Sequence, residues 1–520
     1  MASTQIGAWH PARQDAEDDW QVVRALRGGT TAMRSLGEVF LPKDAREKKR
    51  PDVYVERLKR SFLFPAYDDT VRKIAARPFQ RGVTVSETGE PMLDAIVNDC
   101  DRRGTSLTRF SHRLHDIACD RGVGHFIVDM PAYQAASLAD QIARNVRPYF
   151  SLVHPDNLVN WGFVDDGTGR DVLDFVCIYE QAERRPEGNP FQAIPIERIR
   201  FWSRQAWQVW ERDAIDRGSQ KRGFAQTSND LIQTPQQAQQ WNGSDTGEAY
   251  QMVREGINPL GVVPLVTYYT QMRQPMTGRP PLIDLGWMNV KHWQSSSQQS
   301  QIVHYVRAPM LKGRGMTHEQ VEAGVTLGAG AMMLSTSPDF DISYVTVDGD
   351  SVPAGERDVQ KIEDQMAALG MQPLLITVGP ETATGKAIDE IRAQSEAQAW
   401  AEGLEWALYK GYELAAQWLG VALPDDFDVT VFRDFGIVLR TTTDLQMLQA
   451  DATAGRITVE RYLLEAKRRG LYGDDLDPQE EAGMASEATG ADLRGLQPIP
   501  QPPDAEDDED AEAAAAARPA

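Results

Sequence analysis

The segment from Gly379 to Ala387 is the part of the sequence that comes nearest to a chemical site, because glycines flank threonines and a lysine. A loop that binds nucleotide phosphates needs four residues between its first glycine and the Gly-Lys pair, followed by a Ser or Thr that binds Mg²⁺. Here five residues separate Gly379 from Gly385, and Ala387 occupies the hydroxyl position. The spacing argues against nucleotide binding, and a turn that caps the next helix through Thr382 or Thr384 is the simpler interpretation.

A second set of residues has the spacing of metal ligands on one helical face. It consists of His112, His115, Asp116 and Cys119. The same stretch carries apolar residues at the spacing of an ordinary amphipathic helix. We therefore expect partly buried histidine and cysteine side chains here rather than a metal site.

The sequence holds no other local motif for catalysis. It lacks a serine nucleophile elbow, a catalytic cysteine pairing, a zinc-protease motif and a paired-carboxylate signature. We predict that the protein is not an enzyme, and that it has no catalytic residue, no metal and no cofactor. Its twelve tryptophans are best explained as core residues and contacts between subunits.

Length and composition are those of a folded protein with two or three packed regions. The chain has 520 residues, of which 41% are hydrophobic. Three cysteines, Cys100, Cys119 and Cys177, cannot form a closed set of disulfides, so we expect a reducing compartment. The first residues do not have the pattern of a signal peptide, and no apolar run is long enough to cross a membrane.

The charge is strongly negative, with a formal net value of −22. From Asp504 onward there are seven acids and one arginine, a net of −6, which leaves −16 for the rest of the chain. This balance argues against a protein that reads DNA sequence, which would neutralise phosphates with a basic face. It is compatible with a DNA conduit, because a neutral or acidic wall lets a polyanion slide.

The central part of the sequence predicts two helices around a compact insert. Residues 282–306 follow a double proline and contain no interior proline, which indicates a helix of roughly 37 Å. Its middle, residues 294–301, is neutral and polar on every face. Such a belt favours contact with other copies of the chain or a wet channel, although a linker helix of low helical propensity is an equal alternative.

The insert and the helices after it are also visible in the pattern. Glycines punctuate the residues after Pro309, and short β-type runs at 324–334 and 342–347 predict a small module with strands. Residues 355–370 place Val359, Ile362, Met366 and Leu369 on one stripe. After a turn, residues 387–420 predict a very long helix of roughly 50 Å.

The N-terminal half predicts helices first and strands afterwards. Residues 31–120 are mostly helical in pattern, with short amphipathic candidates at 53–64 and 70–76. The mixed charges of 43–50 indicate a solvated face. Strands are expected at 125–130, 149–153, 172–179, 199–202, 206–210 and 262–269. Residues 218–256 are rich in Gln, Gly and Ser and predict a long loop or a partly disordered segment.

Beyond residue 420 the pattern predicts one strand and two helices. The strand lies at 428–435, and the helices lie at 443–454 and 458–469, with Thr458 placed to cap the second. From about residue 480 the chain is alanine, proline and acid, which predicts a disordered tail.

Several of these segments, in this order and spacing, resemble the tailed-bacteriophage portal proteins, the head-to-tail connector subunits. The similarity is to a subfamily long catalogued as a domain of unknown function, and it covers most of residues 30–480. The residues that carry it are 282–315, 365–370, 382–384 with Ser395, 40–43, 54–60, 122–131, 147–150, and Asn160 with Trp161.

The resemblance implies an α+β chain with the portal fold. It comprises a wing of helices and strands, a two-helix stem, a small α/β clip, a long wing helix and a helical crown. The implied division is an N-terminal arm (1–30), wing (31–281), first stem helix (282–308), clip (309–352), second stem helix (353–371), tunnel loop region (372–386), wing with long helix and strand (387–440), crown (441–480) and acidic disordered tail (481–520).

The resemblance also implies two groups of residues around a DNA channel. The tunnel loop is Gly379, Glu381, Thr382, Ala383, Thr384, Gly385 and Lys386. The lining of the stem is Gln294, Ser295, Gln298 and Gln301. Glutamine and serine can hydrogen-bond to channel water or to other copies without binding DNA tightly.

The function that the resemblance implies is a ring, expected to be a dodecamer, at one vertex of the viral capsid. Double-stranded DNA passes through it without sequence preference during genome packaging and ejection. The expected partners are other copies of the chain, the terminase large subunit, a head-tail adaptor, and the major capsid and scaffolding proteins, with no membrane. The expected location is the virion, after assembly in the host cytoplasm.

Two other functions remain open from the sequence alone. A nucleotide-binding enzyme would use the turn from Gly379 to Lys386. A generic capsid scaffold would associate without a defined central pore.

Overall fold

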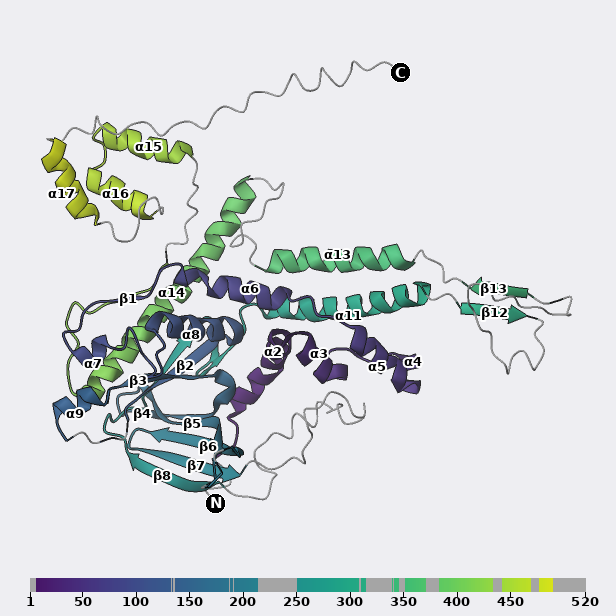
Figure 1. Ribbon diagram of the computed structural model, residues 1–520, viewed down its shortest axis with the longest axis horizontal. Helices are drawn as coiled ribbons and strands as arrows, with labels where there is room; N and C mark the ends of the chain where they lie inside the picture. The colour runs from purple at the N-terminus through teal and green to yellow at the C-terminus, as the bar shows by residue number, and fades with distance from the viewer. Residues whose placement is uncertain are drawn as a thin grey trace, which may run out of the picture. The chain divides into compact units, whose positions relative to one another are not determined.

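We describe the chain from a computed structural model. The described residues are 6–131, 133, 136–186, 188–189, 191–213, 250–307, 310–314, 339, 341–345, 351–370, 383–433, 442–468 and 477–489. They form two compact units, residues 1–435 and 436–520, which are considered separately. Helices and strands both occur, so the α+β class is confirmed (Figure 1).

The helices of the first unit are shorter in its N-terminal part and longer towards its C-terminal end. They are α2 (Pro11–Arg27), α3 (Gly29–Leu36), η1 (Gly37–Val39), α4 (Ala45–Lys49), α5 (Pro51–Arg60), α6 (Ala66–Ala75), η2 (Arg77–Phe79), α7 (Pro91–Asp94), α8 (Leu107–Arg121), α9 (Leu138–Ala143), η3 (Pro155–Asn157), α11 (Ile283–Arg307), α13 (Ser351–Leu369) and α14 (Ala383–Leu419).

The strands of this unit pair antiparallel in five sheets. They are β1 (Thr84–Val85), β2 (Val123–Asp129), β3 (Tyr149–Val153), β4 (Leu158–Asp165), β5 (Asp171–Arg184), β6 (Ile194–Ser203), β7 (Ala206–Asp213), β8 (Gln251–Ile257), β9 (Leu265–Tyr269), β10 (Met272–Gln274), β11 (Thr277–Gly278), β12 (Met310–Arg314), β13 (Asp341–Val345) and β14 (Val429–Thr430). The two larger sheets have the orders β3-β2-β9 and β4-β5-β6-β7-β8, and two-stranded sheets pair β1 with β14, β10 with β11 and β12 with β13.

The first hydrophobic core lies between α8, the three-stranded sheet and α14. Gly411 lets α14 approach the sheet closely, because a Cβ there would lie 2.9 Å from the ring of Phe126 and 3.1 Å from that of Phe150. Trp418 Nε1 donates a hydrogen bond of 3.0 Å to the carbonyl oxygen of Val128. The long helix is thereby fixed to β2.

The second hydrophobic core joins α2, α5, α6, α11 and α13. Trp293 of α11 is completely buried in it. Of the stripe expected on residues 355–370, Ile362 and Met366 are buried, Val359 is half-buried and Leu369 is exposed. Within residues 1–30, expected as an arm, α2 contributes Val22, Val23 and Leu26 to this core.

Most of the predicted strands are confirmed, with boundaries that shift by a few residues. The runs at 125–130, 149–153, 172–179, 199–202, 206–210 and 262–269 fall within or overlap β2, β3, β5, β6, β7 and β9. No predicted run corresponds to β1, β4, β8, β10, β11 or β12. Residues 251–256 lie in β8 rather than in the long loop expected at 218–256, and residues 218–249 of that loop lie outside the described residues.

The charged run at 43–50 is not entirely a solvated face. Asp44 and Glu47 form a capping box that starts α4. Glu47 is fully buried, and its Oε1 lies 2.7 Å from Nε of Arg57, which is buried as well. The prediction was wrong for this carboxylate, because its charge is matched by a cation from the next helix.

The second unit is helical in its described part, with α15 (Thr442–Thr453), α16 (Val459–Arg468) and α17 (Pro478–Thr489). The hydroxyl of Thr458 accepts a 3.1 Å hydrogen bond from the backbone nitrogen of Arg461, which confirms the predicted cap. The strand expected at 428–435 is reduced to β14. Residues 481–489, expected to begin a disordered tail, instead lie in α17, and residues 490–520 lie outside the described part.

A half-buried carboxylate, Asp156, connects η3 to α2 and α8. It accepts hydrogen bonds from Arg121 Nε and Nη2 at 3.2 Å each, and from Arg24 Nε at 3.0 Å. Burial alone raises the pKa of Asp156, but the charges of Arg121 and Arg24 outweigh that effect and hold the pKa well below its usual value. The ionised carboxylate therefore stabilises the fold.

This depressed pKa sets the sign of a pH dependence. Because the folded-state pKa lies below the unfolded value of about 3.9, the stabilisation is complete above about pH 4 and is lost as the pH falls further. We expect the thermal midpoint of the wild type to drop more steeply than that of Asp156→Asn between about pH 4 and pH 2. Asp171→Asn, at the exposed start of β5, should keep the wild-type slope. Equal slopes for wild type and Asp156→Asn would contradict the assignment.

Candidate functional site

Helix α11 is anchored to the second core by a buried amide. Asn289 Oδ1 accepts a 3.1 Å hydrogen bond from the backbone nitrogen of Tyr67, and its Nδ2 donates one of 2.9 Å to the carbonyl oxygen of Phe64. Further along, the hydroxyls of Ser297 and Ser61 lie 2.8 Å apart. One side of α11 is thus fixed against α5 and the start of α6.

Helix α13 lies antiparallel beside α11 (Figure 1). Three polar links define the register. His292 Nε2 lies 3.0 Å from Glu363 Oε1, the hydroxyl of Ser295 lies 3.3 Å from Asp358 Oδ2, and Gln299 Nε2 donates a 2.9 Å hydrogen bond to the carbonyl oxygen of Val352. Residues later in α11 therefore contact residues earlier in α13.

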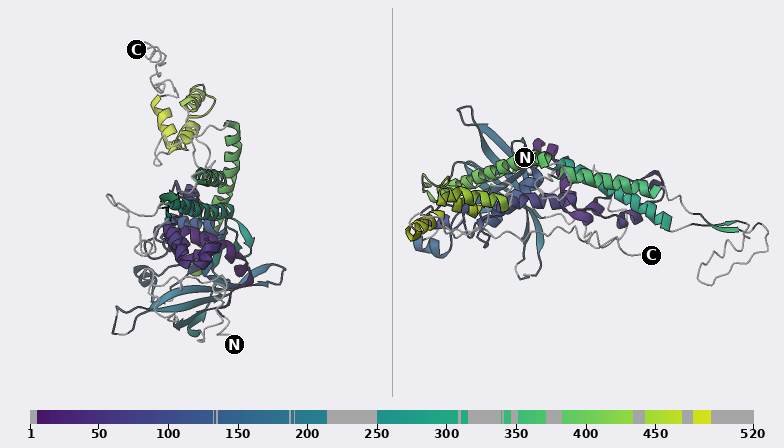
Figure 2. Two further views of the ribbon diagram at one scale, coloured as in Figure 1. Left: turned by 90° about the vertical axis from the view of Figure 1, so that its right-hand side faces the viewer. Right: turned by 90° about the horizontal axis from the view of Figure 1, so that it is seen from above.

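A β-hairpin connects the two helices at one end. Strands β12 and β13 pair from Met310 with Val345 to Arg314 with Asp341. In the sequence β12 follows α11 and β13 precedes α13, and the strand pair lies beyond the ends of the two helices (Figure 2). Strand β13 overlaps the run predicted at 342–347, β12 was not predicted, and the run predicted at 324–334 lies outside the described residues.

The four residues expected to line a channel have different surroundings. Gln294 is half-buried, and its Nε2 donates a 2.9 Å hydrogen bond to the carbonyl oxygen of Phe40. Ser295 contacts α13, and Gln301 lies half-buried beside α5. Gln298 is exposed. Much of the polar belt therefore makes contacts within its own chain, which a pattern of residue types could not distinguish from contacts between copies.

The exposed side of α11 also includes an aromatic and a cationic residue that the sequence analysis did not single out. Trp287 is 49% exposed, and Lys291 one turn later is exposed too. With Gln298 they share one helical face, at positions i, i+4 and i+11. The spacing alone does not reveal this face, because it becomes distinguishable only once the buried residues of α11 are known to occupy the opposite positions.

The residues expected as a tunnel loop fall at the start of α14. This helix begins at Ala383, so Ala383, Thr384, Gly385 and Lys386 belong to its first turn. Gly379, Glu381 and Thr382 lie outside the described residues. The proposed role of this segment stays a prediction.

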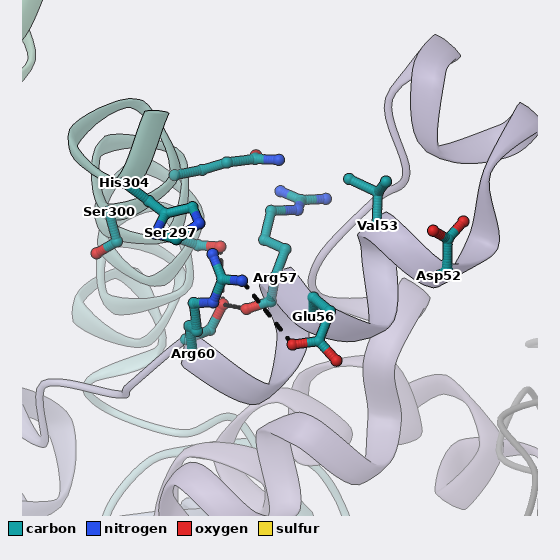
Figure 3. Close-up of a pocket in the computed structure, with 10 residues that line it drawn as sticks. Asp52, Val53, Glu56, Arg57, Arg60, Ser297, Ser300 and His304 are labelled. Atoms are coloured by element: carbon teal, nitrogen blue, oxygen red, sulfur yellow. Dashed lines mark hydrogen bonds and ion pairs between the residues drawn. The ribbon is translucent and has the colours of Figure 1, made fainter. Parts of the chain in front are cut away.

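A small polar cavity of about 180 Å³ lies between α5 and α11 (Figure 3). Arg60 lies 3.8 Å from Glu56 across part of it, and Arg57 is directed to Glu47. Ser300 and His304 border it from α11. Because the positive side chains at the cavity are paired with negative ones, we interpret it as a polar contact region between the two helices.

The histidine and cysteine set on α8 is used for packing. His115 is buried, with Nδ1 2.8 Å from the hydroxyl of Tyr268 and Nε2 3.4 Å from Sγ of Cys119. Burial lowers the pKa of His115 to about 3 and raises that of Cys119. Asp116 instead pairs with Arg27. No group of three or more potential metal ligands comes together in the described residues, and no helix among them has the length and apolar character needed to span a membrane.

Sequence comparison matches one block of the chain to a known family. A family described as a domain of unknown function, DUF4055, matches residues 281–419, just over a quarter of the 520 residues. These limits coincide with the start of α11 and the end of α14. A search of curated proteins gave no match.

Solved structures similar to the chain come from gene transfer agent particles. The virion of the native gene transfer agent particle has a chain with 11% identity and a TM-score of 0.36. A chain in the neck of the empty particle, computed with C6 symmetry, has 12% sequence identity and a TM-score of 0.37. A chain in the neck of the native particle, computed with C12 symmetry, has 11% sequence identity and a TM-score of 0.38. Each match covers 77% of this chain and 89% of the other. At these TM-scores the likeness by itself carries no conclusion about function.

The buried amide of Asn289 gives a test of how α11 is held. Asn289→Ala leaves a buried N–H and a carbonyl oxygen without partners, which costs about 1–3 kcal/mol for such a group. We expect a lower denaturant midpoint and faster amide hydrogen exchange in α11 and α6. Ser300→Ala, on an exposed position of the same helix, serves as the control. Unchanged exchange in Asn289→Ala would contradict the anchoring role.

Proposed function

We propose that this chain is a portal protein, the subunit of a ring with a central DNA channel at one vertex of a viral capsid. The observation that carries the proposal is the antiparallel pair α11 and α13, closed at one end by the β12–β13 hairpin and followed by the long helix α14. The order and spacing of motifs in the sequence support the same assignment.

In this proposal each part of the block has a mechanical role. Helices α11 and α13 form the stem around the channel, and residues 309–352 form a clip outside the capsid. The clip first binds the terminase large subunit during packaging and later binds the head-tail adaptor. Residues 1–281 and α14 form the wing, and the helices of the second unit form the crown. The turn before α14 acts as the tunnel loop.

The charge of the stem suits a conduit for DNA. Helix α13 carries four acids and two bases, and the middle of α11, residues 294–301, carries no charge. A wall with few cations makes few ion pairs with phosphate, so double-stranded DNA slides without being held. No enzyme activity, metal or cofactor is needed for this role.

The proposed surroundings follow from the same assignment. The ring, a dodecamer, contacts the major capsid protein and the scaffolding protein during assembly in the host cytoplasm, and then remains in the virion. A ring forms because one heterologous contact repeats around a single axis until it closes.

Mass in solution and nucleotide binding test this function together. Twelve copies of 57.9 kDa give about 695 kDa, and we expect sedimentation of the purified protein as a particle of that size class. A fluorescent ATP analogue should show no saturable binding. Saturable binding that Lys386→Ala abolishes would instead favour the nucleotide-dependent enzyme. Large particles of undefined mass would favour a generic scaffold.

A further inference from the structure

The exposed face of α11 has the composition of a surface that contacts another protein. Trp287 is 49% exposed, whereas Trp293 on the same helix is completely buried. Large aromatic residues left on a surface are enriched where proteins bind one another, and they often carry much of the binding energy. Lys291 adds a positive charge one turn away.

Helix α13 presents a matching face on its exposed side. Arg357, Asp364 and Ala368 lie at positions i, i+7 and i+11, which places them on one stripe, and all three are exposed. This stripe points away from the side of α13 that carries Ile362 and Met366 into the core. It combines a carboxylate with a small residue.

The register within one chain fixes the heights of these residues. His292 contacts Glu363, and the helices are antiparallel, so Lys291 lies at the height of Asp364 and Trp287 at the height of Ala368. Gln298 lies within a turn of the height of Arg357. A rotation about an axis along the stem leaves heights unchanged, so these pairs also share a height between neighbouring copies of a ring.

From this complementarity we propose that the Trp287–Lys291–Gln298 face of α11 binds the Arg357–Asp364–Ala368 face of α13 in the next copy. Trp287 packs over the small side chain of Ala368, and Lys291 pairs with Asp364. This inference rests on the proposed function, because it needs a ring whose axis follows the stem. It also reassigns Gln298 from the channel lining to the contact between copies.

Mixed single-cysteine variants test the contact directly. Lys291→Cys and Asp364→Cys proteins are mixed before assembly and oxidised, and the products are separated without reductant. We expect a disulfide-linked dimer from the mixture and none from either variant alone, because the contact is between unlike faces. The native Cys100, Cys119 and Cys177 are buried, and wild-type protein gives their background. A dimer from one variant alone, or none from the mixture, overturns the proposal.

Charge exchange and truncation provide a second, independent readout. Lys291→Glu and Asp364→Lys should each raise the concentration for half-assembly about tenfold, and the double variant should restore it. Trp287→Ala should weaken assembly by at least about tenfold. Trp406→Ala, a similarly exposed tryptophan on α14, is the matched control and should assemble normally. Melting temperatures of the unassembled variants separate loss of contact from loss of fold.

The outcomes for the two proposals are distinguishable. If wild-type protein forms rings but the mixture gives no dimer and Trp287→Ala assembles normally, the contact is wrong while the ring stands. If wild-type protein forms no rings under any condition, both proposals fail.

Discussion

The contact between α11 and α13 is the interaction on which the other assignments depend. On one side α11 is held by the second core, through the buried Trp293 and the two hydrogen bonds of Asn289. On the other side it supports α13 through Ile362, Met366 and three polar links. Because α13 packs mainly on this one helix, α11 sets its direction and register. The faces that remain exposed then follow from the same register.

Polar residues on α11 act in two different ways, and burial decides between them. Gln294, Ser297 and Gln299 satisfy backbone or hydroxyl groups of their own chain. They hold the helix at a fixed distance from the end of η1, from α5 and from α13, where an apolar side chain would leave a polar group without a partner. Gln298 does not hold the helix in this way and is exposed. A neutral belt can therefore stabilise one chain and still leave an exposed polar side chain for contact with a neighbouring copy.

The sequence predicted the order of the elements well and their contacts less well. The helix at α11, the stripe of Ile362 and Met366, the strand β3 and the cap at Thr458 follow from local patterns, which depend on neighbouring residues. The buried Glu47 and the divided roles of Gln294 and Gln298 depend on residues far away in the sequence. Periodicity also did not identify Trp287 as exposed. Helical spacing places a tryptophan on one face of a helix, but it does not say whether that face or the opposite one packs into the core. The roles of Gly379, Glu381 and Thr382 lie outside what the described residues can address.

The central claim is that copies of this chain close into a ring around a hole. Negative-stain electron microscopy of the purified wild-type protein tests it most directly. We expect ring-shaped particles of about a dozen copies with stain in the centre. Well-dispersed monomers or dimers, or compact assemblies without a central hole, in conditions where the protein is folded, would contradict the claim.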